Sequence, residues 1–142
     1  MPYQRFLICE SEELIRQSIR DVVALAGHEI SVVPDARAAL DALTAGEFSC
    51  AFVDIDRLES NAFEIPQALR RATLARRPRL IAMTARGSQR DFQLAKDSGF
   101  DITLRKPFVD SALAVALAQL RIQPWVKRPP WKTYKPKQVK ET

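Results

Sequence analysis

The chain has 142 residues, 46% of them hydrophobic and 8% aromatic, which suits one domain with a real core and excludes disorder of the whole chain. Residues 1–122 carry 16 basic and 16 acidic side chains, whereas residues 123–142 carry six basic and one acidic, so the net charge of +5 belongs to the tail. No apolar run approaches the ~20 residues that cross a bilayer, and the N-terminus lacks a signal-like pattern. We therefore expect a cytoplasmic protein.

Strand-like and helical patterns alternate along the chain. Five short apolar runs predict strands: 5–9, 29–33, 50–54, 80–83 and 102–105. Apolar residues at helical spacing predict a helix over 12–26 with the stripe Leu14, Ile15, Ile19, Val22, Val23 and Ala26, and a last helix over 109–121 with Ala112, Leu113, Val115, Ala116, Leu117 and Leu120. These two helices should each bury one face.

The three intervening helices are placed by their end signals. Asp35 is an N-cap for a helix that ends at Gly46, and Ser88 caps a helix that Gly99 stops. The third helix follows Asn61, contains Pro66 near its start and should end at Pro78.

Five β-α units in succession predict an α/β fold. Helices of this length between strands require right-handed crossovers and a parallel sheet that is covered on both faces. In a five-stranded, doubly wound parallel sheet, the first and third strands lie side by side. Cys9 and Cys50, the only cysteines, fall inside these strands and lack the close spacing of a metal or redox motif, so we interpret them as core residues.

Polar side chains follow four of the predicted strands at the point where each strand ends. Glu10 follows the first, Asp54 ends the third, Thr84 follows the fourth and Lys106 follows the fifth. The carboxyl ends of parallel strands meet at one edge of a sheet, which is where ligands bind in such folds. We therefore expect carboxylate, hydroxyl and ammonium groups to share one rim, with Glu10 and Asp54 as neighbours.

These landmarks resemble those of a known family, the receiver domains of bacterial two-component response regulators. The specific segments are residues 6–10, 52–54, 83–85 and 105–108, which read FLICE, FVD, MTA and RKPF. The similarity spans about residues 4–122 and implies the (βα)5, flavodoxin-like receiver fold. It divides the chain into a receiver domain, residues 1–122, and a C-terminal tail, residues 123–142, that is basic and rich in Pro and Trp.

By this resemblance Asp54 is the phosphoacceptor, and Thr84, Ala85 and Lys106 bind the phosphoryl group. The donor would be a sensor histidine kinase or a phosphotransfer protein. The chain would be a single-domain response regulator without a DNA-binding domain, signalling by protein contact and dimerising through its fourth helix, fifth strand and fifth helix. It would be no enzyme beyond catalysing its own phosphorylation and dephosphorylation.

The resemblance also implies a Mg²⁺ site made of Glu10, Ser11, Asp54 and the backbone carbonyl of Asp56. Receivers usually have two adjacent acids after the first strand, whereas this chain has Glu10 and Ser11. Mg²⁺ prefers six oxygens at ~2.1 Å, and a neutral hydroxyl is a poorer ligand than a carboxylate. We expect weak Mg²⁺ binding.

Three further positions depart from the family pattern: Leu58 and Ala62 replace a common proline and glycine, and Thr103 replaces the aromatic switch residue. They leave open a pseudo-receiver that binds partners without phosphorylation. Asp54 and Asp56 also resemble the nucleophile motif of haloacid-dehalogenase-type phosphatases, but only Asp110 follows Lys106 where a further acidic pair is needed.

The tail interleaves Trp125 and Trp131 with prolines and basic residues. Such a segment should be extended, and its tryptophans favour a docking element over a purely solvated tail. Single-stranded nucleic acid, an anionic membrane surface and a protein groove all remain open as its partner.

Overall fold

The computed structural model describes residues 4–23, 28–46, 48–56, 62–74 and 77–120. The strands are β1 Arg5–Cys9, β2 Glu29–Val33, β3 Cys50–Asp54, β4 Arg79–Thr84 and β5 Ile102–Arg105. The helices are α1 Glu13–Val23, α2 Ala36–Ala45, α3 Ile65–Arg71, α4 Gln89–Ser98 and α5 Asp110–Gln119, with the short 3-10 helix η2 Ala62–Glu64 before α3. All five predicted β-α units are present.

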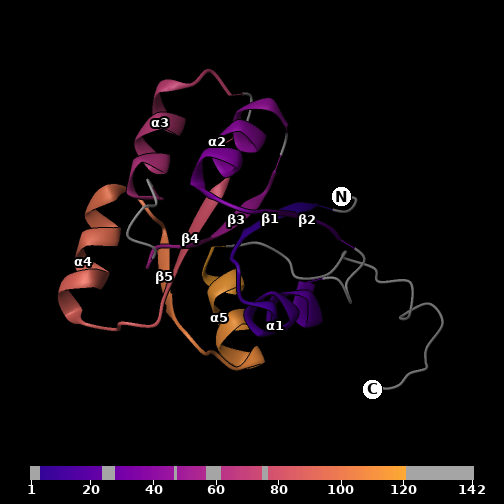
Figure 1. The fold of residues 1–142 in the computed structure, drawn as a ribbon, viewed down its shortest axis with the longest axis vertical. Coiled ribbons are helices and arrows are strands. Elements are labelled where there is room, and N and C mark those ends of the chain that lie inside the picture. The colour runs from indigo at the N-terminus through magenta and orange to yellow at the C-terminus, as the bar shows by residue number, and fades with distance from the viewer. Residues whose placement is uncertain (1–3, 24–27, 47, 57–61, 75–76, 121–142) are drawn as a thin grey trace.

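The strands form one parallel sheet in the order β2-β1-β3-β4-β5 (Figure 1). The predicted α/β class and the adjacency of the first and third strands are confirmed. Cys9 is in register with Val53, and Asp54 with Met83, so the strands end close to the same line. The polar residues that end β3 and β4 or follow β1 and β5 therefore lie at one edge of the sheet.

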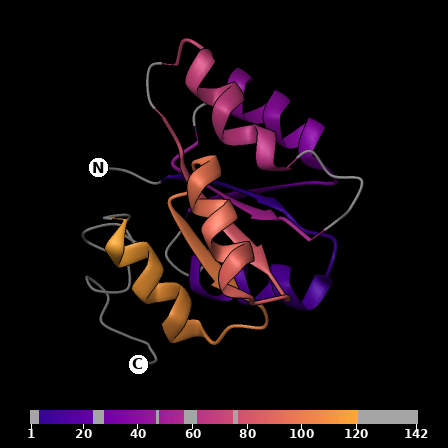
Figure 2. The same ribbon diagram turned by 90° about the vertical axis from the view of Figure 1, so that its left-hand side faces the viewer.

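Helices cover both faces of the sheet. In Figures 1 and 2, α1 and α5 lie side by side against one face, and α2, α3 and α4 cover the other. The strand side chains alternate between the two cores, which is why β3 is buried at every position and shows no polar alternation. Cys9 and Cys50 are buried, one in each core, as predicted.

The helix ends use the side chains that the sequence indicated. The Asp35 carboxylate accepts a hydrogen bond from the Ala38 N–H (2.8 Å), and the Ser88 hydroxyl accepts one from the Asp91 N–H (3.0 Å). Gly99 ends α4 with φ of +117°, a left-handed conformation that L side chains avoid. The predicted N-cap Asn61 lies outside the described residues.

Some predicted details of the helices are wrong. The third helix ends at Arg71, with Ala72 as its C-cap, rather than at Pro78, while Pro66 sits in its first turn, where a missing N–H costs nothing. Leu14 is 78% exposed and Val115 is 55% exposed, although both belonged to predicted buried stripes. The buried residues of α1 repeat every four positions, Ile15, Ile19 and Val23, and Leu14 lies about 100° away from that line.

Candidate functional site at the carboxyl edge of the sheet

The ammonium of Lys106 lies between two carboxylates at the carboxyl edge. Its Nζ is 3.1 Å from Oε1 of Glu10 and 3.2 Å from Oδ1 of Asp54. The backbone N–H of Lys106 donates to the carbonyl of Thr84 (2.8 Å), which extends the β4–β5 pairing by one residue and fixes where the side chain starts. Residues that are 52 and 96 positions away from Lys106 in sequence thus meet at one atom.

Burial makes this cluster electrostatically strong. Glu10, Asp54 and Lys106 are each at most 9% exposed. Burial raises the pKa of Glu10, and the neighbouring Asp54 charge adds to that rise, while the Glu12 N–H and the Lys106 ammonium oppose it. Burial alone would lower the pKa of Lys106, but the hydrogen bond to Glu10 and the charge of Asp54 outweigh it and raise the pKa above 10.5. Lys106 is therefore fully cationic at neutral pH.

A second group of contacts surrounds the carboxylate of Asp56, next to the Lys106 cluster. The Thr84 hydroxyl donates to Oδ1 of Asp56 (2.5 Å), and the Ala85 N–H donates to Oδ2 (2.7 Å). Lys106 Nζ is 3.9 Å from the same carboxylate. Asp56 itself is held by its N–H, which donates to Oδ1 of Asp54 (3.0 Å). Two of the three groups predicted to bind the phosphoryl group, the Thr84 hydroxyl and the Ala85 N–H, are thus engaged by Asp56.

Arg86 belongs to this site and was not predicted. Its Nη2 donates to the backbone carbonyl of Asp56 (3.1 Å), and its Nε is 4.0 Å from Oδ1 of Asp56. Its own N–H donates to the Thr84 hydroxyl (3.0 Å). The sequence offered one indication that Arg86 lies in this site: it comes two residues after Thr84, in the loop that begins at the same edge of the sheet.

The structure brings together six of the residues singled out from the sequence: Glu10, Asp54, Asp56, Thr84, Ala85 and Lys106. Ser11 is exposed at the margin of this group. Leu58, Trp125 and Trp131 lie outside the described residues, as does the whole tail from residue 121.

Several of the oxygens predicted to bind Mg²⁺ already accept hydrogen bonds from the protein's own donors. Glu10 accepts from Lys106 and, through Oε2, from the Glu12 N–H (3.1 Å), and the carbonyl of Asp56 accepts from Arg86. Among the described residues, no group of three or more His, Cys, Asp or Glu side chains could hold a metal ion. Mg²⁺ prefers near-octahedral oxygen ligands, and an ammonium between two of the carboxylates leaves few of these oxygens available, so this arrangement favours weak binding of the ion.

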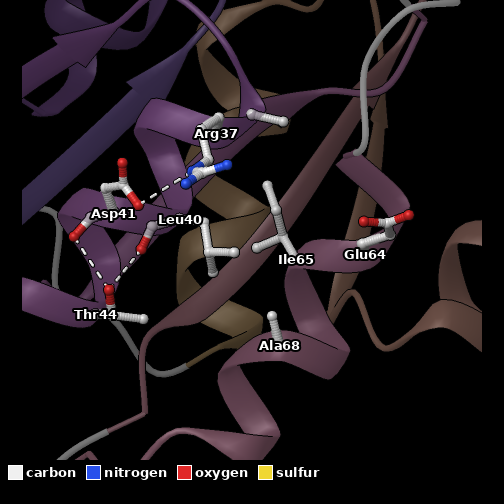
Figure 3. A pocket seen from close by; sticks show the side chains of 8 residues that line it. Arg37, Leu40, Asp41, Thr44, Glu64, Ile65 and Ala68 are labelled. Atoms are coloured by element: carbon white, nitrogen blue, oxygen red, sulfur yellow. Dashed lines mark hydrogen bonds and ion pairs between the residues drawn. The ribbon is translucent and has the colours of Figure 1, made fainter.

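A separate hollow of about 420 Å³ lies between α2 and α3, lined by Leu40, Ile65 and Ala68 (Figure 3). Three of its polar side chains have partners within the lining itself. Arg37 pairs with Asp41 at 3.5 Å on an exposed surface, and the Thr44 hydroxyl donates to the carbonyl of Leu40 (2.9 Å). This hollow lacks the buried charges of the carboxyl edge, which is therefore the better candidate site.

A parallel five-stranded sheet with Asp54, Thr84 and Lys106 converging at its carboxyl edge defines the receiver class of protein. The family model of the response regulator receiver domain matches residues 6–118, and the chain belongs to that family. The part of the chain that the structure describes contains no helix long and apolar enough to cross a membrane.

Relatives of similar sequence include a transcriptional regulatory protein and a response regulator. The chain is 29% identical over 126 residues to the transcriptional regulatory protein TcrA of Mycobacterium tuberculosis, covering 89% of this chain and 49% of the relative. It is 33% identical over 104 residues to the response regulator protein PmrA of Pseudomonas aeruginosa, covering 73% of this chain and 46% of the relative. The chain thus spans about half the length of the relatives that it matches.

Solved structures show the same fold at lower identity. The receiver domain of a sensor histidine kinase from Pseudomonas aeruginosa, which holds a magnesium ion in its active-site cleft, superposes with a TM-score of 0.71 at 21% identity, covering 83% of this chain and 97% of that one. The chemotaxis response regulator CheY4 of Vibrio cholerae gives a TM-score of 0.73 at 24% identity, covering 84% and 99%.

Proposed function

We propose that Asp54 accepts a phosphoryl group from the phosphohistidine of a sensor histidine kinase or phosphotransfer protein. An oxygen of the Asp54 carboxylate attacks phosphorus, so that an O–P bond forms as the N–P bond of the donor breaks. The electron pair of the broken bond stays on the imidazole nitrogen, which then takes a proton. The product is an acyl phosphate on this chain and a free histidine on the donor.

The single observation that carries this proposal is the contact of Lys106 with Asp54 at 3.2 Å in a buried setting. Phosphoryl transfer depends mainly on positioning and on neutralising the charge that develops on the phosphoryl oxygens. A permanently cationic ammonium beside the attacking carboxylate supplies that charge. The Thr84 hydroxyl and the Ala85 N–H, across the same edge, are the donors for the other oxygens.

The proposal has further parts, which concern the metal ion, catalysis and signalling. Mg²⁺ binds weakly, because Ser11 is neutral and the nearby carboxylates already have partners. The chain is not an enzyme beyond its own phosphorylation and dephosphorylation. It passes the signal by protein contact from a cytoplasmic location, and α4, β5 and α5 are the surface for a downstream target or a second copy.

The alternatives receive less support. A pseudo-receiver would not need the buried ammonium of Lys106 in contact with Asp54. A haloacid-dehalogenase-type phosphatase would need further acidic residues at the site. Asp110 is exposed at the start of α5 and has no contact with the Lys106 cluster among the described residues.

Intact-mass measurement after incubation with acetyl phosphate and Mg²⁺ tests the proposal. We expect the wild type to gain one phosphoryl group and Asp54→Asn to gain none. Asp41→Asn, which removes an exposed carboxylate on α2, is the matched control and should label as the wild type does. Equal labelling of wild type and Asp54→Asn, or no labelling of either, would refute Asp54 as the acceptor.

A further inference from the structure

The carboxylate of Asp56 occupies a complete anion-binding arrangement. Two donors contact its two oxygens directly, the Thr84 hydroxyl at 2.5 Å and the Ala85 N–H at 2.7 Å. Two cations lie slightly farther from the same carboxylate: Lys106 Nζ is 3.9 Å from Oδ2 and Arg86 Nε is 4.0 Å from Oδ1. Hydroxyl, backbone N–H and cations are the groups that bind phosphoryl oxygens.

The backbone fixes Asp56 in this place. The N–H of Ile55 donates to the carbonyl of Met83 (3.0 Å), which continues the β3–β4 pairing beyond the end of β3. The N–H of Asp56 donates to Asp54 (3.0 Å), and its carbonyl accepts from Arg86 (3.1 Å). With both backbone groups held, the side chain points across the edge to the residues that follow β4, and only 21% of it is exposed.

We propose that Asp56 is a built-in competitor of the phosphoryl group for the Thr84 and Ala85 donors. This inference rests on the proposed function, because the competition concerns a phosphoryl group on Asp54. Each donor hydrogen can serve one strong acceptor, so the carboxylate must leave before phosphoryl oxygens bind there. Asp56 therefore slows acceptance of the phosphoryl group and destabilises the acyl phosphate once it has formed.

Binding of free phosphate tests whether Asp56 occupies the Thr84 and Ala85 donors, without any phosphoryl transfer to Asp54. Inorganic phosphate is titrated into Asp54→Asn and into Asp54→Asn/Asp56→Ala, with the Ala85 amide followed by NMR. We expect phosphate to bind the double variant about tenfold or more tightly, since two hydrogen bonds to a charged group become available. Asp54→Asn/Asp97→Ala, which removes an exposed acid on α4, should match Asp54→Asn. Equal phosphate affinity in all three proteins would overturn the inference.

A covalent measurement tests the consequence. Acetyl phosphate should label Asp56→Ala several-fold faster than the wild type, and Asp56→Asn, which keeps the shape but removes the charge, should fall between them. If Asp56→Ala labels no faster than the wild type, the competitor role is wrong. If the wild type and every variant stay unlabelled, the proposed function fails, and the phosphate titration still decides whether Asp56 occupies the anion site.

Discussion

Replacing Lys106 with methionine tests whether one ammonium holds the carboxyl edge together. The methionine side chain fills similar space but leaves Glu10 and Asp54 facing each other without a cation. The lysine side chain is 7% exposed, and those of the two acids are 1% and 7% exposed, so water screens these charges little. Removing one partner of a buried ion pair costs about 3–5 kcal/mol. That is a large share of the ~5–15 kcal/mol that stabilises a typical domain.

The loss should depend on pH. Burial raises the pKa of Glu10, and the Glu12 N–H and the Lys106 ammonium both oppose that rise, so without the ammonium the pKa rises further. As the pH falls, Glu10 protonates in the variant, and one of the two facing negative charges disappears. We therefore expect the full destabilisation at pH 7.5 and a much smaller one near pH 4.5.

Urea unfolding followed by far-UV circular dichroism measures this loss. Circular dichroism is preferable to tryptophan fluorescence, because Trp125 and Trp131 both lie in the tail. Lys96→Met, an exposed lysine in the last turn of α4, is the control and should cost less than about 1 kcal/mol. A Lys106→Met loss no larger than the control at pH 7.5, or a loss that grows as the pH falls, would refute the reasoning.

Two further predictions concern the neighbouring residues. The folded-state pKa of Glu10 lies above its ordinary value of 4.5. Between the unfolded-state and folded-state pKa values, the folded chain binds more protons than the unfolded chain, so the free energy of unfolding falls as the pH rises through this range. Glu10→Gln should therefore flatten the fall in unfolding free energy above pH 4.5, and an unchanged slope in urea titrations would contradict this. Ser11→Asp should tighten Mg²⁺ binding by ~1 kcal/mol, about fivefold, through an added carboxylate; unchanged affinity by calorimetric titration would show that the Ser11 position is not a ligand position.

The sequence predicts the strands and the residues that end them because both depend on local chemistry. Uncharged runs bounded by polar residues mark buried strands, and parallel pairing then forces their ends to one edge. Glu10, Asp54 and Lys106 could be placed together on this basis alone. The helix caps Asp35, Ser88 and Gly99 were likewise predictable, because each makes its hydrogen bond within three or four residues.

What the sequence left undetermined depends on side-chain direction. Asp56 and Arg86 sit in loops, where no periodicity indicates which way a side chain points. The contact of Asp56 with Thr84 joins residues 28 positions apart through two rotamers and a loop path. The same limit applies at helix ends, where Leu14 fits an apolar pattern yet lies in the first turn of α1, beyond the line of contact with the sheet.

Charge balance connects Asp54, the proposed phosphoryl acceptor, with Asp56, its proposed competitor. Glu10, Asp54 and Asp56 place three negative charges near two cations, Lys106 and Arg86. A phosphoryl group adds about one further negative charge when it replaces the carboxylate charge of Asp54. If Asp56 stayed in contact with Thr84 and Ala85, the new oxygens would meet a carboxylate and would find both of these donors engaged. Movement of Asp56 toward solvent removes one negative charge from the site and uncovers the Thr84 hydroxyl and the Ala85 N–H at once. Displacement of this one side chain would thus both reduce the negative charge around the acyl phosphate and make two donors available to its oxygens.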